Sequence, residues 1–106
     1  MATKSLGEFE QIVLLAVLAL GNQSYVVPII SEILQRTGRK TSHAAVYVAL
    51  TRLEEKGLVV SHLAEPTAQR GGRAKRFFSV LPEAVTRLRE SQNAMLAMRQ
   101  GVEEMK

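Results

Sequence analysis

Residues 38–57 have the sequence GRKTSHAAVYVALTRLEEKG, a short polar connection followed by an amphipathic segment between two glycines. Apolar residues recur in this segment at the three- and four-residue steps of one helix face: Val46, Ala49, Leu50 and Leu53. Thr41 or Ser42 can act as the N-cap, because a hydroxyl accepts a free backbone N–H, and Gly57 can end the helix. We therefore predict a helix within Thr41 to Gly57 that buries one narrow stripe and exposes its other faces.

A first helix is predicted upstream, from about Ser5 to Leu20. Its apolar stripe has helical spacing and comprises Leu6, Phe9, Ile12, Val13, Ala16, Val17 and Leu20. Ser5 with Glu8 three residues later has the pattern of a capping box. The pair Gly21-Asn22 then supplies the turn residues that end this helix.

A second helix is predicted between these two. Its apolar stripe comprises Val26, Ile29, Ile30, Ile33 and Leu34. Pro28 is tolerated only in a first turn, where its missing N–H costs no hydrogen bond, so the helix begins near Ser24 or Tyr25. Gly38 is its natural end. Two helices joined by a short polar turn have the pattern of a helix-turn-helix.

The pattern changes to that of a hairpin after the third helix. Residues 58–63 and 75–80 are rich in β-branched and aromatic residues and predict two strands. Residues 65–73 between them have loop composition with two glycines. A lone hairpin is marginally stable in water, so this one, termed the wing, must pack on the helices.

A long last helix is predicted from Pro82, a residue that suits a first turn. A helix of about 23 residues is about 35 Å long, more than a three-helix core can cover. We therefore predict an α+β, mostly α fold. Residues 1–81 form a winged helix-turn-helix domain and residues 82–106 a C-terminal dimerisation helix.

Basic residues concentrate in the middle of the chain. Residues 36–76 carry nine basic residues against three acidic ones, a net charge of +6, whereas the whole chain carries +4. A localised basic segment is typical of a protein that binds a polyanion. Cysteine is absent, which excludes disulfides, thiolate catalysis and Cys-ligated zinc. The chain has two histidines, His43 and His62, so a His-based metal site would need carboxylate ligands as well. We expect no cofactor and no enzymatic activity.

These features favour double-stranded DNA as the partner. Small and hydrogen-bonding side chains at the start of the third helix suit base edges in the major groove. Cations just before that helix and around the wing tip suit phosphates and the minor groove. The predicted DNA-binding residues are Arg39, Lys40, Thr41, Ser42, His43, Ala44, Tyr47, Thr51, Arg70, Gly71, Gly72, Arg73, Lys75 and Arg76.

Residues 45–59, AVYVALTRLEEKGLV, resemble the recognition-helix signature of PadR-family transcriptional regulators, in which a Tyr precedes an Arg-Leu-Glu-x-x-Gly-Leu/Ile stretch. Residues 6–10, LGEFE, and 71–78, GGRAKRFF, are also similar to that family, and the resemblance covers roughly residues 5–90. The chain departs from the family where Val48 stands in place of the usual Pro. The resemblance implies a repressor that acts on operator DNA as a homodimer.

The resemblance also implies that the last helix packs on the partner protomer and on the partner's first helix. The predicted dimerisation residues are Phe9, Val85, Leu88, Met95, Leu96 and Val102. Methionines adapt their shape readily, so a small apolar effector at this interface is a second hypothesis.

An alternative function is a winged-helix module for protein–protein contact without DNA binding. A cationic wing loop together with a basic turn argues against it, because such modules seldom need both. The longest apolar run, residues 12–20, is too short to span a bilayer, and no signal-peptide pattern precedes it. We therefore expect a cytoplasmic protein with no membrane partner.

Overall fold

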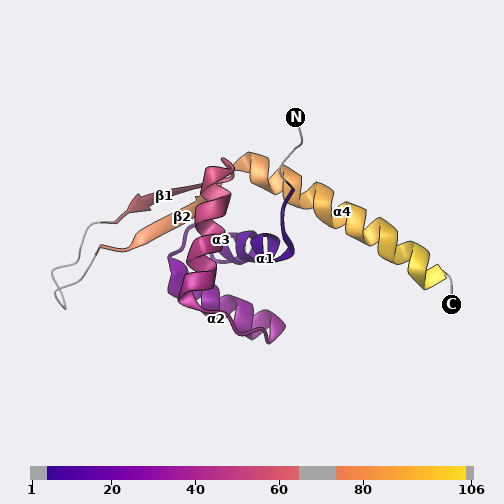
Figure 1. The fold of residues 1–106 in the computed structure, drawn as a ribbon, viewed down its shortest axis with the longest axis horizontal. Helices are drawn as coiled ribbons and strands as arrows, with labels where there is room; N and C mark the ends of the chain where they lie inside the picture. The colour runs from indigo at the N-terminus through magenta and orange to yellow at the C-terminus, as the bar shows by residue number, and fades with distance from the viewer. Residues whose placement is uncertain (1–4, 65–73, 105–106) are drawn as a thin grey trace.

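The structure, a computed structural model, describes residues 5–64 and 74–104. Its elements follow the predicted order, which is α1 (Glu8–Ala19), α2 (Val26–Thr37), α3 (His43–Glu55), β1 (Val59–Leu63), β2 (Arg76–Val80) and α4 (Pro82–Glu104). Figure 1 shows α1, α2 and α3 gathered together, with the hairpin leaving on one side and α4 projecting on the other. The predicted α+β, mostly α architecture is confirmed.

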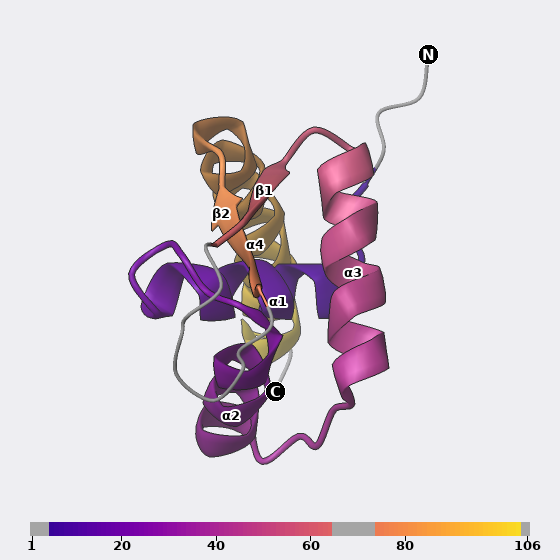
Figure 2. The same cartoon turned by 90° about the vertical axis from the view of Figure 1, so that its left-hand side faces the viewer.

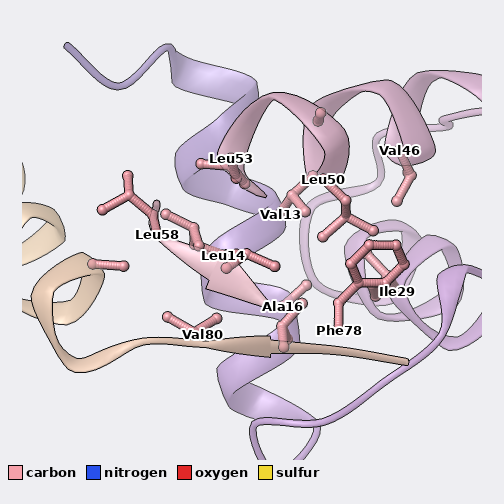
Figure 3. Packing of buried hydrophobic residues seen from close by; sticks show 14 of the residues in the cluster. Val13, Leu14, Ala16, Ile29, Val46, Leu50, Leu53, Leu58, Phe78 and Val80 are labelled. Carbon is pink, nitrogen blue, oxygen red and sulfur yellow. The ribbon is translucent and has the colours of Figure 1, made fainter. Parts of the chain in front are cut away.

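One hydrophobic core joins the three helices to the sheet. Leu14 of α1, Ile29 of α2 and Leu50 of α3 are each fully buried, and Phe78 of β2 packs among them (Figure 3). Ala84 and Leu88 on the first two turns of α4 complete this core. The wing therefore packs on the helices, as a marginal two-stranded hairpin requires.

The sheet contains one pairing that the sequence pattern did not predict. β1 and β2 are antiparallel, from Val59 opposite Val80 to Leu63 opposite Arg76. Ser24, just before α2, forms an isolated bridge with Phe78, through N–H to O distances of 3.1 and 2.8 Å. A single bridged residue has no periodicity of its own, so only the folded chain reveals that β2 lies between β1 and the α1–α2 connection.

The predicted start of the first helix is wrong. α1 begins at Glu8 with Gly7 as its N-cap, and the Gly7 N–H donates to the Glu10 carboxylate at 2.9 Å. Ser5 and Glu8 therefore do not form the expected capping box. The three-residue spacing of a box is present, but it is displaced by two positions and uses the side chain that faces the protein interior.

The other helix ends follow the predicted turn chemistry. α2 begins after Tyr25, holds Pro28 in its first turn and ends at Gly38, which has a left-handed φ of +74°. The hydroxyl oxygen of Ser42 accepts the Ala45 N–H at 3.0 Å, so Ser42 is the N-cap of α3. Within the described residues, no helix is long and apolar enough to cross a membrane.

Candidate nucleic-acid interface

The outer face of α3 is free for contact with a ligand. Figure 2 shows α3 at the edge of the domain, beside the hairpin. Its buried residues are the predicted stripe, Val46, Ala49, Leu50 and Leu53. At 100° per residue, Ala44, Val48 and Thr51 lie on the opposite side of the helix. Ala44 and Val48 are exposed, whereas Thr51 is half-buried and its hydroxyl donates to the Tyr47 carbonyl at 2.9 Å. Val48 was not among the predicted DNA-binding residues, although its four-residue spacing from Ala44 places it on the same face.

The amino-terminal end of α3 combines exposed side chains with free backbone N–H groups. Lys40, Ser42 and His43 are all exposed. Ser42 uses a hydroxyl lone pair for its cap, which leaves its O–H free to donate. The hydroxyl oxygen of Thr41 is instead shielded from solvent and has no hydrogen-bond partner among the described residues. In this conformation Thr41 can therefore offer a ligand its backbone but not its hydroxyl.

Tyr47 lies between the helix and the sheet. Its side chain is 43% exposed, and its ring meets the buried Phe78 ring edge-on, with centroids 6.2 Å apart. Contact with a core side chain limits the rotamers that a ring can adopt. Tyr47 therefore presents an aromatic surface at the junction of α3 and the wing.

Arg39 in the α2–α3 turn is held by the first turn of α1. Its Nη1 lies 3.1 Å from Glu8 Oε1, and its guanidinium carbon lies 5.0 Å from the centre of the Phe9 ring. Phe9 was predicted as a dimerisation residue; in this chain its partly buried ring packs against the core and carries Arg39 on its outer side. Arg39 and Phe9, separated by 30 residues in sequence, thus form one surface feature.

The described cations of the wing are also held in place. Lys75 Nζ lies 4.2 Å from the centre of the Tyr25 ring at the start of α2. Arg76 Nη1 donates to the Ser61 hydroxyl at 3.0 Å, and Ser61 donates to Glu54 of α3 at 2.8 Å. A chain of side-chain hydrogen bonds therefore links the wing to α3. The predicted wing-tip residues lie outside the described residues: Arg70, Gly71, Gly72 and Arg73.

Comparison with known proteins agrees with this arrangement. The sequence profile of the Transcriptional regulator PadR-like family matches residues 14–82. The chain belongs to this family. Its members regulate transcription, so this PadR-like chain is a regulator rather than an enzyme. No curated protein matches the chain.

Solved structures share the fold of this PadR-like chain at low sequence identity. A PadR family transcriptional regulator from Eggerthella lenta is 19% identical, with a TM-score of 0.73 over 92% of this chain and 85% of that one. One from Clostridium difficile is 17% identical, with a TM-score of 0.71 over 90% and 96%. F93 from STIV, described as a winged-helix DNA-binding protein, is 15% identical, with a TM-score of 0.66 over 87% and 91%. These similarities establish the winged-helix fold.

Lys56, at the end of α3 in this PadR-like chain, binds to partners within the protein. Lys56 Nζ donates to Glu10 Oε1 at 2.7 Å and to the Ser5 carbonyl at 3.0 Å. Burial by itself would raise the pKa of Glu10, but the hydrogen bonds from Lys56 and the Gly7 N–H, with the charges of Lys56 and Arg52, outweigh it and lower that pKa. Glu10 is therefore a carboxylate at neutral pH, and its partner Lys56 is engaged rather than free for phosphate.

The predicted dimerisation residues fall into two groups in this PadR-like chain. Leu88 is buried in the chain's own core, and Val85 and Phe9 are partly buried against it. Further along α4, Met95, Leu96 and Val102 are 71%, 52% and 61% exposed. The second group is the part of α4 that presents apolar side chains outward. No group of three or more metal-ligating residues occurs in the described parts of the chain.

Proposed function

We propose that this PadR-like chain is a repressor that binds operator DNA as a homodimer, with the amino-terminal half of α3 in the major groove. One observation carries the proposal. Between Ala44 and Thr51, the face of α3 opposite its buried stripe presents small side chains, and cations lie both before the helix and on the adjoining strand.

The residues divide into two kinds of contact. Ala44, Val48 and Thr51 on the outer face, with His43 and Tyr47 beside them, suit base edges, because small and apolar groups allow close approach and contact thymine methyl groups. The cations of the interface suit phosphates, which position a protein without reading sequence. The predicted cations of this kind among the described residues are Arg39, Lys40, Lys75 and Arg76.

The dimer is supported by the outer half of α4. Met95, Leu96, Met98 and Val102 expose an apolar stripe that no other described part of the chain covers. Exposed apolar stripes of this kind mark association surfaces in soluble proteins. A symmetric dimer would present two α3 helices to half-sites one helical turn, or a multiple of it, apart. A small apolar effector at this interface stays a prediction.

The test is a fluorescence-anisotropy titration with a labelled duplex from the region upstream of the chain's own gene and a scrambled duplex of equal length. We expect tighter binding to the first duplex and a steep loss of affinity between about 50 and 200 mM salt, because neutralised phosphates release counterions. Affinity that ignores both salt and sequence would overturn the proposal. Absence of binding at low salt, together with a stable complex with another protein, would favour the protein-contact module instead.

Substitutions separate the two kinds of contact. Lys40→Ala and Lys75→Ala should weaken binding to both duplexes alike, whereas His43→Ala and Val48→Ala should change the preference between them. Arg89→Ala is the matched control, because it removes a cation from α4 and leaves α3 and the wing unchanged. Equal loss on both duplexes from the His43 and Val48 variants would contradict the base-reading role.

A further inference from the structure

The contact between Glu8 and Arg39 joins two parts of the chain that have different roles. Arg39 lies in the turn before α3, and Glu8 is the first residue of α1, 31 positions earlier. Their side chains meet at 3.1 Å through a single N–H of the guanidinium. The Phe9 ring supports the guanidinium carbon at 5.0 Å. Arg39 is thus held between an apolar ring and a carboxylate, next to the helix that we propose enters the major groove.

The ion pair between Glu8 and Arg39 can be broken at small energetic cost. The Glu8 side chain is 78% exposed and that of Arg39 is 42% exposed. Solvent-exposed pairs of this kind contribute little to stability, so an incoming anion can replace the carboxylate at small cost. A guanidinium carries five donors, and the Glu8 contact uses one of them, which leaves the others available for a phosphate.

The neighbouring ion pair on the same turn of α1, between Glu10 and Lys56, is instead shielded from solvent. The side chains of Lys56 and Glu10 are only 17% and 11% exposed. Glu10 also accepts the Gly7 N–H, and Lys56 also donates to the Ser5 carbonyl. Replacing Glu10 would leave a shielded ammonium without its carboxylate, which is costly. Two carboxylates two positions apart therefore differ: Glu10 has a permanent partner, and Glu8 has an exchangeable one.

A DNA phosphate is the anion best placed to replace Glu8 as the partner of Arg39. The amino-terminal end of α3 follows Arg39 by a few residues, and the positive end of the helix dipole together with free N–H groups attracts phosphate there. The same phosphates repel Glu8. Loss of the Glu8 charge would remove that repulsion and free the Arg39 guanidinium, and both effects should favour the DNA-bound state.

We propose that Glu8 is an intramolecular stand-in for a DNA phosphate, which holds Arg39 on the Phe9 ring in the free protein and releases it to the DNA backbone on binding. This inference rests on the proposed DNA-binding function. Because the exchange involves only a phosphate, Glu8 lowers the affinity for every DNA sequence by the same factor. It leaves the preference among sequences unchanged.

The test compares Glu8→Gln, Arg39→Ala and the double variant in the anisotropy titration described above. Glu8→Gln keeps the size and polarity of the side chain and removes its charge. It should bind both the upstream and the scrambled duplex about two- to five-fold more tightly, the range expected from an exposed ion pair. Arg39→Ala should weaken binding to both duplexes and reduce the salt slope by about 1. The gain from Glu8→Gln should be clearly smaller in the Arg39→Ala background, because only the lost repulsion between Glu8 and the phosphates then contributes to it.

A matched control separates exchange from general charge. Glu90→Gln on α4, which projects away from the wing (Figure 1), makes the same change in net charge. It should leave affinity nearly unchanged, because charges beyond about 10 Å are screened at moderate salt. Unfolding curves of the Glu8→Gln variant should lie close to those of the unaltered protein, so that a gain in affinity cannot be attributed to a change in folding.

The outcomes distinguish this inference from the function on which it rests. If the unaltered protein binds DNA with a salt dependence but Glu8→Gln does not gain affinity, the exchange is overturned and DNA binding stands. If Glu8→Gln gains affinity equally with and without Arg39, its effect is general repulsion and the exchange is again overturned. If the unaltered protein shows no salt-dependent binding, the proposed function itself fails.

Discussion

Lys56 and Glu10 are 46 residues apart in sequence, and the Lys56 ammonium lies 2.7 Å from the Glu10 carboxylate. The pair ties the end of α3 to the first turn of α1, and each group has one further hydrogen bond: Lys56 donates to the Ser5 carbonyl, and Glu10 accepts the Gly7 N–H. The position of α3 relative to α1 therefore depends on this contact as well as on the core beneath it.

Loss of the Glu10 charge should destabilise the fold. Glu10→Gln leaves the shielded Lys56 ammonium with a weaker partner, and we expect the free energy of unfolding to fall by about 2 kcal/mol in urea denaturation. Glu8→Gln, which breaks an exposed pair on the same turn, should cost less than about 1 kcal/mol. Equal losses in the two variants would contradict the difference in their roles.

The same pair predicts how stability depends on pH. The folded protein lowers the pKa of Glu10 from its ordinary value of 4.5, so the unfolded chain takes up this proton first as the pH falls. The stabilisation is fully present above the ordinary pKa and is lost as the pH falls through the lowered one. The difference in unfolding free energy between the unaltered protein and Glu10→Gln should therefore be constant near neutral pH and shrink below pH 4.5. A difference that grows on acidification would have the wrong sign.

Ser61 should contribute to DNA binding without touching DNA. Its hydroxyl accepts from Arg76 and donates to Glu54, which fixes the Arg76 guanidinium relative to α3. Ser61→Ala should weaken binding to all duplexes about two- to ten-fold, the range for one lost hydrogen bond, and should have no effect in the Arg76→Ala background. Ser79→Ala removes a hydroxyl from the paired strand and is the control. An undiminished effect of Ser61→Ala without Arg76 would contradict this role.

Two leucines of α4 should respond differently to the same substitution. Leu88 is 3% exposed and packs in the chain's own core, so Leu88→Ala should lower the free energy of unfolding by about 3 kcal/mol. Leu96 is 52% exposed, and Leu96→Ala should instead raise the dimer dissociation constant about ten-fold in analytical ultracentrifugation. An unchanged dissociation constant for the Leu96 variant would remove this residue from the proposed interface.

Asn22 should stabilise the junction of the helices and the sheet. Its side chain accepts the Val80 N–H at 2.8 Å and donates to the Val80 carbonyl at 3.2 Å, and its backbone has a positive φ of 62°. Asn22→Ala should cost about 2 kcal/mol of unfolding free energy. Asn22→Gly should cost less, because glycine adopts a positive φ freely while losing the same hydrogen bonds. Gln23→Ala, next to it and exposed, is the control, and a Gly variant less stable than the Ala variant would contradict the backbone argument.

Local chemistry accounts for the elements that the residue pattern predicted correctly. Pro28 in the first turn and Gly38 after the last residue mark the two ends of α2, because proline and glycine restrict or permit backbone angles wherever they occur. The buried stripe of α3 follows from helical periodicity, and the same periodicity places Val48 on the free face opposite it, although Val48 was not among the predicted DNA-binding residues. These features depend on residues within one or two turns of each other, so they can be predicted before the chain is folded.

Partners distant in sequence account for what the pattern did not predict. α1 is capped through Glu10 rather than Glu8, with Glu10 also bound to Lys56 across 46 positions. Arg39 is exposed, as expected, but it is held by Glu8 and Phe9. Leu88 is apolar, as expected, but it packs in the core of the same chain. Periodicity indicates which face of a helix is apolar or charged. Which surface that face meets depends on how the helices pack, and that is determined by the whole core at once.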